Sequence, residues 1–286
     1  MTIVTDSRCT EYYRPGHPER PERVVRTVER LRAQTKLRVD WAEPLRVEEA
    51  QLLRAHSEHH LARLDEPLDF DTDTPGLPGI KAHALRSVGG ALRALAAVRS
   101  GEPTFSLLRP PGHHATIERA MGFCYLNSIA IAVLEALARG VGRVAVFDFD
   151  VHHGNGTEDI LLDVERCAYF SVHQFPAYPG TGEESYGNAH NYPVRPYAPR
   201  EDHRRALAAA LADLRRFEPA LIAVSAGFDA YRGDPIAAEA LEPEDYHWLG
   251  KSLRASGVPV FSVLEGGYSN DLPDLVLEYL QGLAGA

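Results

Sequence analysis

Cysteine is scarce in this chain. There are three cysteines among 286 residues, and no two of them form a Cys-x-x-Cys pair. Scattered thiols suit a reducing cytoplasm rather than a disulfide framework. No stretch approaches the ~20 apolar residues of a membrane helix, and the first residues lack the basic and apolar regions of a secretory signal. We therefore expect a cytoplasmic protein with no membrane partner.

Basic residues are also in deficit. The chain has 40 Asp and Glu against 30 Lys and Arg, a formal net charge of -10. This balance argues against direct nucleic-acid binding and weakly favours cationic substrates. Hydrophobic residues, in contrast, make up 44% of the chain, which is enough for a full core. The length fits one large domain, so residues 1–286 are expected to form a single unit.

Apolar runs alternate with amphipathic segments along the chain. Strands are predicted at 104–108, 143–148, 168–172, 221–225 and 258–264. Helices are predicted at 17–34, 47–64, 81–100, 127–139, 157–163, 200–217, 243–255 and 271–283. Long loops are predicted at 65–78 and 173–197. The alternation indicates an α/β protein with a parallel sheet covered on both faces.

The most informative segment begins at the end of the apolar run 143–147. It reads Asp-Phe-Asp-Val-His-His-Gly-Asn-Gly from Asp148 onward. Side chains alternate along a strand, so Asp148, Asp150 and His152 are expected to point to one side. Open α/β sheets carry their chemistry at the carboxyl ends of strands. Buried aspartates also need a partner, a hydrogen bond or a metal ion.

A metal site is the preferred interpretation of three of these strand-end residues. Asp150 and His152 follow one apolar run, and Asp229 follows another, in Ser-Ala-Gly-Phe-Asp. Two carboxylates and one imidazole leave a coordination position open for water, as catalytic zinc sites do. The alternative makes the aspartates loop caps and His152 an ordinary core histidine. It requires three coincidences at strand ends, so we favour the metal site.

The tandem pair His113-His114 follows a rigid Pro-Pro-Gly turn. Such a pair can supply a general base and a neighbour that tunes its charge. Each ring needs an orienting acceptor, and Asp148 and Asn155 are the candidates. A carboxylate raises the basicity of an imidazole more than an amide does, so unequal partners would separate the two roles. The alternative is a pair of surface loop histidines.

Aromatic residues near these segments are further candidates. Tyr268 lies in a glycine turn, where its phenol could reach a developing oxyanion; the alternative is an aromatic plug at a strand end. Phe123 and Tyr178 are either walls of an apolar slot or plain core residues, and the sequence leaves both open. Cys124 is expected to be a buried small hydrophobe.

Another histidine cluster, His56, His59 and His60, lies in the predicted helix 47–64. His56 and His60 are four residues apart and could bind metal from one helix face. A solvated helix face is the preferred interpretation, because no strand-end partner is nearby in the sequence.

Together these motifs resemble the zinc-dependent histone deacetylase superfamily, which includes bacterial deacetylase-like amidohydrolases and acetylpolyamine amidohydrolases. The segments that carry the resemblance are 109–115, 122–127, 148–156, 227–229 and 265–268, with His17-Pro18-Glu19-Arg20-Pro21 near the start. The resemblance covers nearly the whole chain. It implies the arginase/deacetylase fold, a three-layer α/β/α domain with a mostly parallel sheet.

The resemblance also implies roles for individual residues. Zinc would be held by Asp150, His152 and Asp229. His114 would be the general base and acid, and Asn155 would be its hydrogen-bond partner. His113, paired with Asp148, would be the electrostatic partner of His114. Tyr268 would donate to the substrate carbonyl. A structural potassium ion would be held by Asp148, Asp150, Ser171 and the carbonyls of His152 and Val172.

For the substrate, the resemblance implies a narrow acyl-lysine channel. Its walls would be Phe123 and Tyr178, with Gly122, Ile236 and Gly267 beside them. In the family an aspartate of the loop before the third helix grips the substrate backbone. Asp71 and Asp73 both fit that description, and Asp73 is preferred.

Three positions depart from the pattern of many eukaryotic members. Asn155 replaces an aspartate and Glu265 a glycine, as in several bacterial members. Ile236 stands where polyamine deacetylases of the eukaryotic type have a glutamate, which weakens a polyamine assignment of that type without excluding the bacterial type.

The expected reaction is hydrolysis of an acyl amide of lysine or a similar amine by metal-activated water. The partner is an acetylated lysine or a small acylated amine such as an acetylpolyamine. One rival is an arginase-type ureohydrolase, but its second metal requires a carboxylate where this chain has Gly154. The other rival is an inactive module that binds acetylated ligands, which predicts a broken set of catalytic residues.

Overall fold

A computed structural model describes residues 1–98 and 102–286. It contains one eight-stranded sheet in the order β2-β1-β3-β8-β7-β4-β5-β6, with every neighbouring pair parallel. The strands are β1 (Thr2–Val4), β2 (Asp40–Ala42), β3 (Thr104–Ser106), β4 (Val144–Asp148), β5 (Cys167–Gln174), β6 (Ala189–Val194), β7 (Leu221–Ala226) and β8 (Val260–Leu264).

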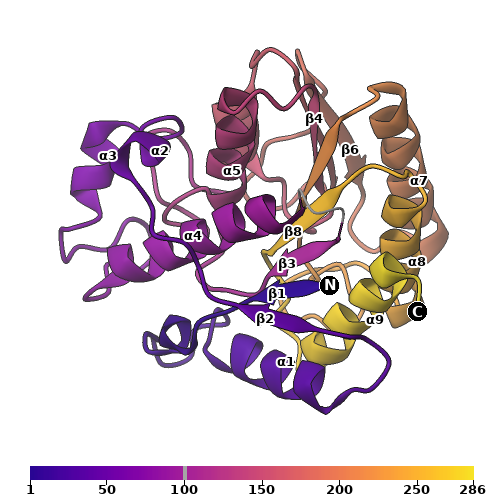
Figure 1. Cartoon of the computed structure of the whole chain (residues 1–286), viewed down its shortest axis with the longest axis horizontal. Helices are drawn as coiled ribbons and strands as arrows, with labels where there is room; N and C mark the ends of the chain where they lie inside the picture. The colour runs from indigo at the N-terminus through magenta and orange to yellow at the C-terminus, as the bar shows by residue number, and fades with distance from the viewer. Residues whose placement is uncertain (99–101) are drawn as a thin grey trace.

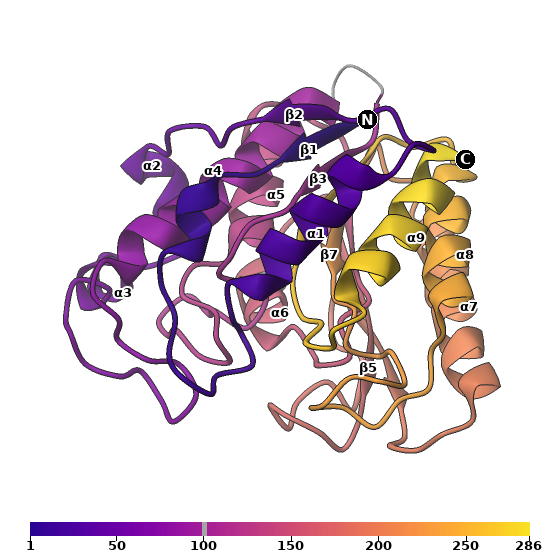
Figure 2. The same ribbon diagram turned by 90° about the horizontal axis from the view of Figure 1, so that it is seen from below.

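Helices cover both faces of this sheet. They are η1 (Ser7–Thr10), a 3-10 turn, and α1 (Glu22–Ala33), α2 (Glu49–Leu52), α3 (Glu58–Arg63), α4 (Ile80–Val98), α5 (Ser128–Ala138), α6 (Asn155–Leu161), α7 (Arg200–Arg216), α8 (Pro243–Arg254) and α9 (Leu272–Ala284). Helices α4 and α5 lie on one face, and α1, α7, α8 and α9 lie on the other (Figures 1 and 2). The result is the three-layer α/β/α arrangement that the resemblance implies.

The central strands are buried along their whole length. Every residue of β4, β7 and β8 is buried, because helices cover the sheet on both sides. This explains why these strands read as continuous apolar runs in the sequence. None of the helices in the part of the chain that the structure describes is long and apolar enough to cross a membrane.

The register of the sheet brings the chemically interesting segments together. Asp148 at the end of β4 pairs with Ser225 of β7, and Ser225 pairs with Val263 of β8. Val263 in turn pairs with Ser106 at the end of β3. The polar segments that follow these four strands therefore leave the sheet at the same edge.

The sequence pattern misses three strands. Predicted loop 173–197 is wrong over residues 189–194, which form edge strand β6. Its sequence contains Pro193 and the adjacent polar residues His190 and Asn191, a combination that is typical of a loop but that an edge strand tolerates. Strands β1 and β2 have only three residues each, too short to show a period.

Two predicted helices also need correction. The helix expected at 17–34 begins only at Glu22, because two prolines at positions 18 and 21 hold the preceding residues in a turn. The helix expected at 47–64 is two short helices, α2 and α3, and the Ser57 side chain caps the second. The end expected at Ser100 for the helix that is now α4 lies outside the described residues.

The expected solvated face of His56 and His60 is wrong. Both side chains are buried, and only His59 is exposed. His56 Nδ1 lies 2.9 Å from the Thr116 carbonyl, and the Asn127 amide donates to His56 Nε2 at 2.9 Å. The ring is therefore a neutral connector between the loop before α5 and the turn before α3.

This burial predicts acid sensitivity of the fold. Burial, with a contribution from the His60 charge, lowers the pKa of His56 to about 3. The unfolded chain binds a proton at this position below its ordinary pKa of about 6.5, whereas the folded chain does not. His56 should therefore cost the native state about 1.4 kcal/mol per pH unit as pH falls below about 6.5.

Urea unfolding of a His56→Gln variant at pH 8, 6.5 and 5 tests this. Relative to the wild type, the free energy of unfolding of the variant should rise by about 2 kcal/mol between pH 6.5 and pH 5, whatever the difference between the two proteins at pH 8. His59→Gln, at an exposed position three residues further along the chain, is the matched control and should not reproduce this change. Parallel pH curves for His56→Gln and wild type would contradict the prediction.

Candidate active site

Local hydrogen bonds in the turn after β4 orient the side chains of Asp150 and His152. The Asp150 amide donates to Asp148 Oδ1 at 3.1 Å, and the His152 amide donates to Asp150 Oδ1 at 3.0 Å. These are two consecutive turns closed by an aspartate side chain. Strand β4 ends at Asp148, so the expected strand alternation does not extend to Asp150 and His152. The two turns, rather than strand geometry, direct these side chains.

Asp150, His152 and Asp229 meet at one point. His152 Nδ1 lies 3.2 Å from Asp150 Oδ1 and 3.1 Å from Asp229 Oδ2. The second oxygen of each carboxylate is already engaged, because Asp150 Oδ2 accepts from the Gly266 amide at 2.6 Å and Asp229 Oδ1 from the Val151 amide at 2.8 Å. Asp150 Oδ1, which also accepts from the His152 amide, Asp229 Oδ2 and His152 Nδ1 thus face a common centre.

This donor set fits a divalent cation. The candidate ligand atoms of the three residues all lie within 4.8 Å of one another. Burial, together with repulsion from the buried Asp150 carboxylate, raises the pKa of Asp229 above its ordinary value. A cation at the common centre would relieve that repulsion. Three protein ligands drawn from carboxylates and imidazoles, with one position left open, are what a catalytic zinc site requires.

Two glycines make room for this cluster. A Cβ atom on Gly227 would lie 2.1 Å from Asp150 Oδ2, and one on Gly266 would lie 2.1 Å from Asp229 Oδ2. The backbone of the turns after β7 and β8 therefore approaches the carboxylates more closely than any side chain allows. This close approach is the structural reason for glycine beside each acidic residue.

The tandem histidines have the unequal partners that the sequence suggests. His113 Nδ1 lies 3.1 Å from Asp148 Oδ2, and His114 Nδ1 lies 2.8 Å from Asn155 Oδ1. Asn155 begins α6, and both imidazoles are buried with ring centroids 4.0 Å apart. The surface-loop alternative for this pair is therefore wrong.

These partners separate the protonation of the two rings. Burial opposes a charge on His113, but Asp150 and Asp148 outweigh it and raise the pKa of His113 to about 10. Burial, reinforced by the His113 charge, lowers the pKa of His114 well below its usual value. At neutral pH His114 is therefore the neutral ring, able to accept a proton.

A buried glutamate supports the Pro-Pro-Gly turn from below. Glu265 Oε2 accepts from the Gly112 amide at 2.7 Å and from the His113 amide at 3.1 Å. The position that departs from many eukaryotic members therefore holds the backbone that carries the histidines. Burial raises the pKa of Glu265 to about 7, although the His113 charge opposes the rise.

A pocket of about 330 Å³ opens onto His152 of this cluster and onto His114. Its lining comprises His17, Pro18, Asp73, His114, Gly122, Phe123, His152, Tyr178, Ile236 and Tyr268. This volume lies at the lower end of ordinary small-molecule sites. Most of the expected wall residues are thus brought together; Gly267 lies next to Tyr268 in the chain.

Two aromatic side chains shape the pocket. Tyr178 stands edge-on to His114, with ring centroids 5.1 Å apart, and is 41% exposed at the mouth. Phe123 has a φ of 70°, a left-handed conformation that is uncommon for a bulky residue. Its amide donates to Thr74 Oγ1 at 3.1 Å, which ties it to the loop before α4. Such conformations cluster at functional sites.

Tyr268 lies in the irregular segment between β8 and α9. Its ring packs under the Arg23 guanidinium, 4.7 Å from the ring centre, and edge-on to Phe123 at 5.7 Å. Burial raises the pKa of Tyr268 well above its usual value, so the phenol keeps its proton. A protonated phenol lining the pocket can donate a hydrogen bond to a developing oxyanion.

The acidic loop before α4 reaches the mouth of the pocket through Asp73. Its carbonyl lies 3.0 Å from His17 Nε2, and its side chain is exposed. Asp71 is half-buried, and its Oδ1 accepts from the Asp73 amide at 2.9 Å. Asp73 lines the pocket, and Asp71 supports the turn that presents it.

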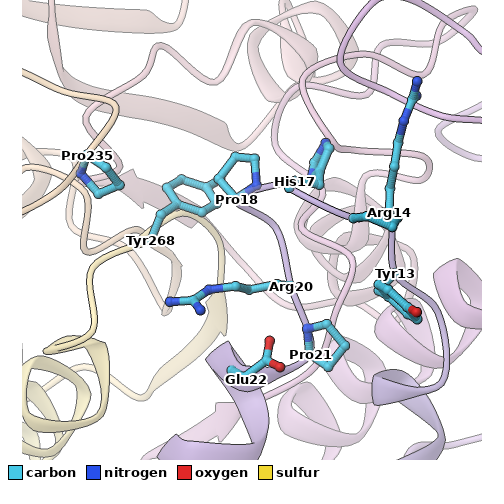
Figure 3. Close-up of a pocket in the computed structure, with 11 residues that line it drawn as sticks. Tyr13, Arg14, His17, Pro18, Arg20, Pro21, Glu22, Pro235 and Tyr268 are labelled. Carbon is cyan, nitrogen blue, oxygen red and sulfur yellow. The ribbon is translucent and has the colours of Figure 1, made fainter.

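A second hollow of about 720 Å³ adjoins this pocket. The two share His17, Pro18 and Tyr268. Figure 3 shows Tyr268 in this hollow, with Pro18 and Pro235 on either side of its ring in the view. Tyr268 therefore forms part of the wall of both cavities.

The residues expected to bind potassium share Asp150 and His152 with the cluster and add Asp148, Ser171 and Val172. Asp148 and Ser171 are paired across β4 and β5, and both are buried with Val172. Asp148 Oδ2 also accepts from the Tyr169 hydroxyl at 3.0 Å, and Ser171 Oγ lies 2.8 Å from His173 Nδ1.

Sequence reasoning misses two charged residues at this site. Arg23 donates from Nε to the Gly267 carbonyl at 2.7 Å and from Nη2 to the Glu265 carbonyl. Asp234 accepts from the Tyr268 amide at 2.7 Å. Both residues act across long sequence separations. The only local signal is the position of Asp234 between a glycine and a proline, which is typical of a turn.

The all-parallel three-layer fold, with an acid–imidazole cluster at its carboxyl edge, defines a hydrolase of the arginase/deacetylase fold class. Comparison with protein families agrees: the Histone deacetylase domain matches residues 17–283. The chain belongs to this family, and the sequence resemblance is confirmed.

Curated relatives and a solved structure extend this result. The chain is 36% identical to a probable deacetylase from Archaeoglobus fulgidus over 95% of this chain and 82% of the relative. It is 37% identical to a histone deacetylase-like amidohydrolase from Pseudomonas aeruginosa over 94% and 77%. The crystal structure of an acetylpolyamine aminohydrolase from Burkholderia pseudomallei has a TM-score of 0.91 and 28% identity, covering 99% of this chain and 98% of the other.

Proposed function

We propose that this protein is a zinc-dependent deacetylase that hydrolyses the acyl amide of an acetylated lysine or a similar small acylated amine. The observation that carries the proposal is the convergence of Asp150, His152 and Asp229 at the base of a narrow pocket beside His114 and Tyr268. Membership of the histone deacetylase family supports the same reaction.

Asp150, His152 and Asp229 would hold the zinc ion. Zinc bound there would supply Lewis acidity to the acyl carbonyl and lower the pKa of the attacking water. The pocket has the size for one acyl group and the alkyl chain of a lysine, and Phe123 and Tyr178 would form its apolar walls.

The protein groups divide the proton transfers between them. His114, kept neutral by burial and by the His113 charge, takes the proton from the attacking water. The same ring returns this proton to the leaving amine. His113, held by Asp148, provides a positive charge beside the reaction centre. The Tyr268 phenol donates to the oxygen that becomes negative.

The remaining assignments of the resemblance belong to the same proposal. A structural potassium ion would be held by Asp148, Asp150, Ser171 and the carbonyls of His152 and Val172. Its support is that a polar group and two acids are buried together at the ends of β4 and β5. Asp73 would contact the substrate backbone, because its side chain is exposed at the mouth of the pocket.

A second substrate class, the acetylpolyamines, is favoured by several relatives named acetylpolyamine amidohydrolase. An acetylpolyamine aminohydrolase superposes on nearly the full length of both chains. Against this class, Ile236 places an apolar side chain in the pocket where a cationic polyamine would profit from an acid. An acetylated lysine side chain is apolar up to its amide, so it fits this wall better.

An arginase-type reaction has little support in this site. It requires a further carboxylate at position 154, but a Cβ atom there would lie 2.3 Å from Asp148 Oδ2 and 2.5 Å from the Tyr169 hydroxyl. An inactive binding module is equally disfavoured, because His113, His114 and Tyr268 all line or support the pocket.

Metal removal tests the proposed function. We expect purified protein to bind one zinc ion per chain and to cleave a fluorogenic acetyl-lysine substrate. A chelator should lower the rate by at least ~10³-fold, because the nucleophilic water loses its activation, and added zinc should restore it. Chelator-resistant turnover, or two manganese ions per chain, would contradict the proposal.

A comparison of substrates identifies the natural class. Rates should be measured side by side on acetyl-lysine peptides, acetylated polyamines and longer acyl-lysines at equal concentration. We expect the highest kcat/KM on acetyl-lysine peptides. A preference for acetylpolyamines would instead favour the second class, and an Ile236→Glu variant should then increase that preference.

A further inference from the structure

Tyr268 lies on a backbone segment that has no regular structure to hold it. Residues 265–271 connect the end of β8 to the start of α9. Gly267 has a φ of 111°, and a Cβ atom there would lie 2.8 Å from the Phe228 Cβ and 2.9 Å from Leu272 Cδ1. A glycine turn of this kind is free to rotate unless other groups bind its backbone.

The carbonyl side of this segment is held by Arg23. Its guanidinium binds the carbonyls of Glu265 and Gly267, and it also covers the Tyr268 ring. The amide of Gly266 binds Asp150, and its carbonyl accepts from the Phe228 amide at 3.1 Å. These contacts stop at Gly267 and leave the amides of the next two residues to another partner.

Asp234 is that partner. Its Oδ2 accepts from the Tyr268 amide at 2.7 Å and from the Ser269 amide at 3.2 Å. The carboxylate is 34 residues away in the chain and is buried. Hydrogen bonds from amides to an ionised carboxylate are among the stronger ones in proteins, so this contact fixes the backbone on both sides of the Tyr268 Cα atom.

The other oxygen of the same carboxylate binds the loop that carries Ile236, another residue of the pocket wall. Asp234 Oδ1 accepts from the Ile236 amide at 3.1 Å, and both Ile236 and Tyr268 line the pocket. The turn is closed by the Asp234 amide, which donates to the Tyr231 carbonyl at 2.9 Å. One buried carboxylate therefore joins the backbone of the phenol donor to the loop that forms the neighbouring wall.

We propose that Asp234 is the positioning residue for Tyr268, setting the direction of the phenol toward the substrate carbonyl. This inference rests on the proposed function, in which Tyr268 stabilises the oxyanion. Asp234 touches neither substrate nor metal ligand in this scheme. Its effect passes through the backbone of Tyr268, and a displacement of about 1 Å in such a group can lower a rate about 10²-fold.

A double-mutant cycle tests the proposal. Asp234→Asn and Asp234→Ala are made in the wild type and in a Tyr268→Phe background, and kcat and KM are measured on an acetyl-lysine substrate. We expect Asp234→Asn to lower kcat about 10- to 100-fold with KM changed less than about 3-fold, because the lost interaction acts in the transition state. In the Tyr268→Phe background the same change should cost less than about 3-fold.

A readout independent of activity accompanies the cycle. Hydrogen exchange followed by mass spectrometry should show faster exchange in peptides that cover residues 265–271 of Asp234→Asn and of Asp234→Ala, because asparagine offers one acceptor oxygen where the carboxylate offers two, and alanine offers none. Asp271→Asn is the matched control: Asp271 is exposed and binds the Tyr231 hydroxyl at 3.1 Å. It should leave kcat, bound zinc and exchange of Tyr268 unchanged. If Asp234→Ala does not fold, the equally sized Asn variant carries the test.

Three results would overturn the inference: an equal loss from Asp234→Asn in both backgrounds, a loss larger than that of Tyr268→Phe, or no loss at all. A residue that acts through Tyr268 can cost no more than Tyr268 itself contributes. Failure of the proposed function looks different, because the wild type would then cleave no acylated amine, or Tyr268→Phe would be fully active.

Discussion

Replacing Tyr268 by phenylalanine is expected to lower kcat on an acetyl-lysine substrate by about 10²–10³-fold, the usual effect of removing one oxyanion donor. The ring is held by the Arg23 guanidinium and Phe123, and these packing contacts do not need the hydroxyl. Bound zinc, KM and the melting temperature should therefore stay close to those of the wild type. Steady-state kinetics measures kcat and KM, zinc analysis of the same preparation measures the bound metal, and thermal unfolding measures the melting temperature.

The second tyrosine of the pocket provides the control. Tyr178→Phe removes a hydroxyl from a side chain that is partly exposed at the mouth and contacts His114 edge-on. We expect its kcat to remain within about 3-fold of wild type, because a pocket wall contributes shape rather than a donor. Undiminished turnover by Tyr268→Phe would refute the role of Tyr268 in catalysis.

The largest expected effect on stability comes from Glu19. Its carboxylate binds Arg109 in a fully buried, bidentate pair, with contacts of 2.6 and 2.7 Å. The same carboxylate accepts from the Tyr12 hydroxyl at 3.1 Å and from Arg23 Nη1 at 3.2 Å. The other Arg109 donors bind backbone carbonyls, those of Cys9, Tyr12 and Glu19 itself. This network fastens the amino-terminal turn to the end of β3.

Removing the carboxylate leaves the arginine charge buried without its counter-ion. We expect Glu19→Gln to lower the free energy of unfolding by about 3–5 kcal/mol, the usual cost of breaking one partner of a buried pair. For a chain of this size the melting temperature should fall by roughly 2–4 °C per kcal/mol. Urea and thermal unfolding, followed by circular dichroism, measure both quantities.

An exposed ion pair provides the comparison. Arg30 Nε lies 2.6 Å from Asp274 Oδ1, and both side chains are in contact with solvent. Asp274→Asn should change the free energy of unfolding by less than about 1 kcal/mol. If Glu19→Gln costs no more than Asp274→Asn, the Arg109 network does not stabilise the fold as we expect.

The central part of the sheet could be predicted from the sequence, because its signals are local. Strands β4, β7 and β8 are continuous apolar runs, and each is followed within a few residues by a carboxylate or a tyrosine beside glycine. The partners of the tandem histidines could also be proposed, since Asp148 and Asn155 belong to one motif. The structure places both within hydrogen-bond distance.

The misses share a physical cause. Strand β6 and the three-residue strands at the other edge gain their hydrogen bonds only from neighbours that the sheet brings to them, so their own sequences carry little period. The sequence around His56 is typical of a solvated helix face, yet the His56 ring is buried and contacts the Thr116 carbonyl and the Asn127 amide. Burial of this kind depends on segments that are far away in the chain.

The amino-acid sequence by itself determined the class of fold, the candidate metal-ligating residues and the edge of the sheet where they meet, because apolar periodicity and parallel strand direction are properties of local sequence. Only the tertiary structure decided which buried charged groups support the site and the amino-terminal turn. Asp234 reaches Tyr268 across 34 residues and Glu19 reaches Arg109 across 90. A buried charge is stabilised by whichever partner the folded chain brings to it, and no local pattern records that partner.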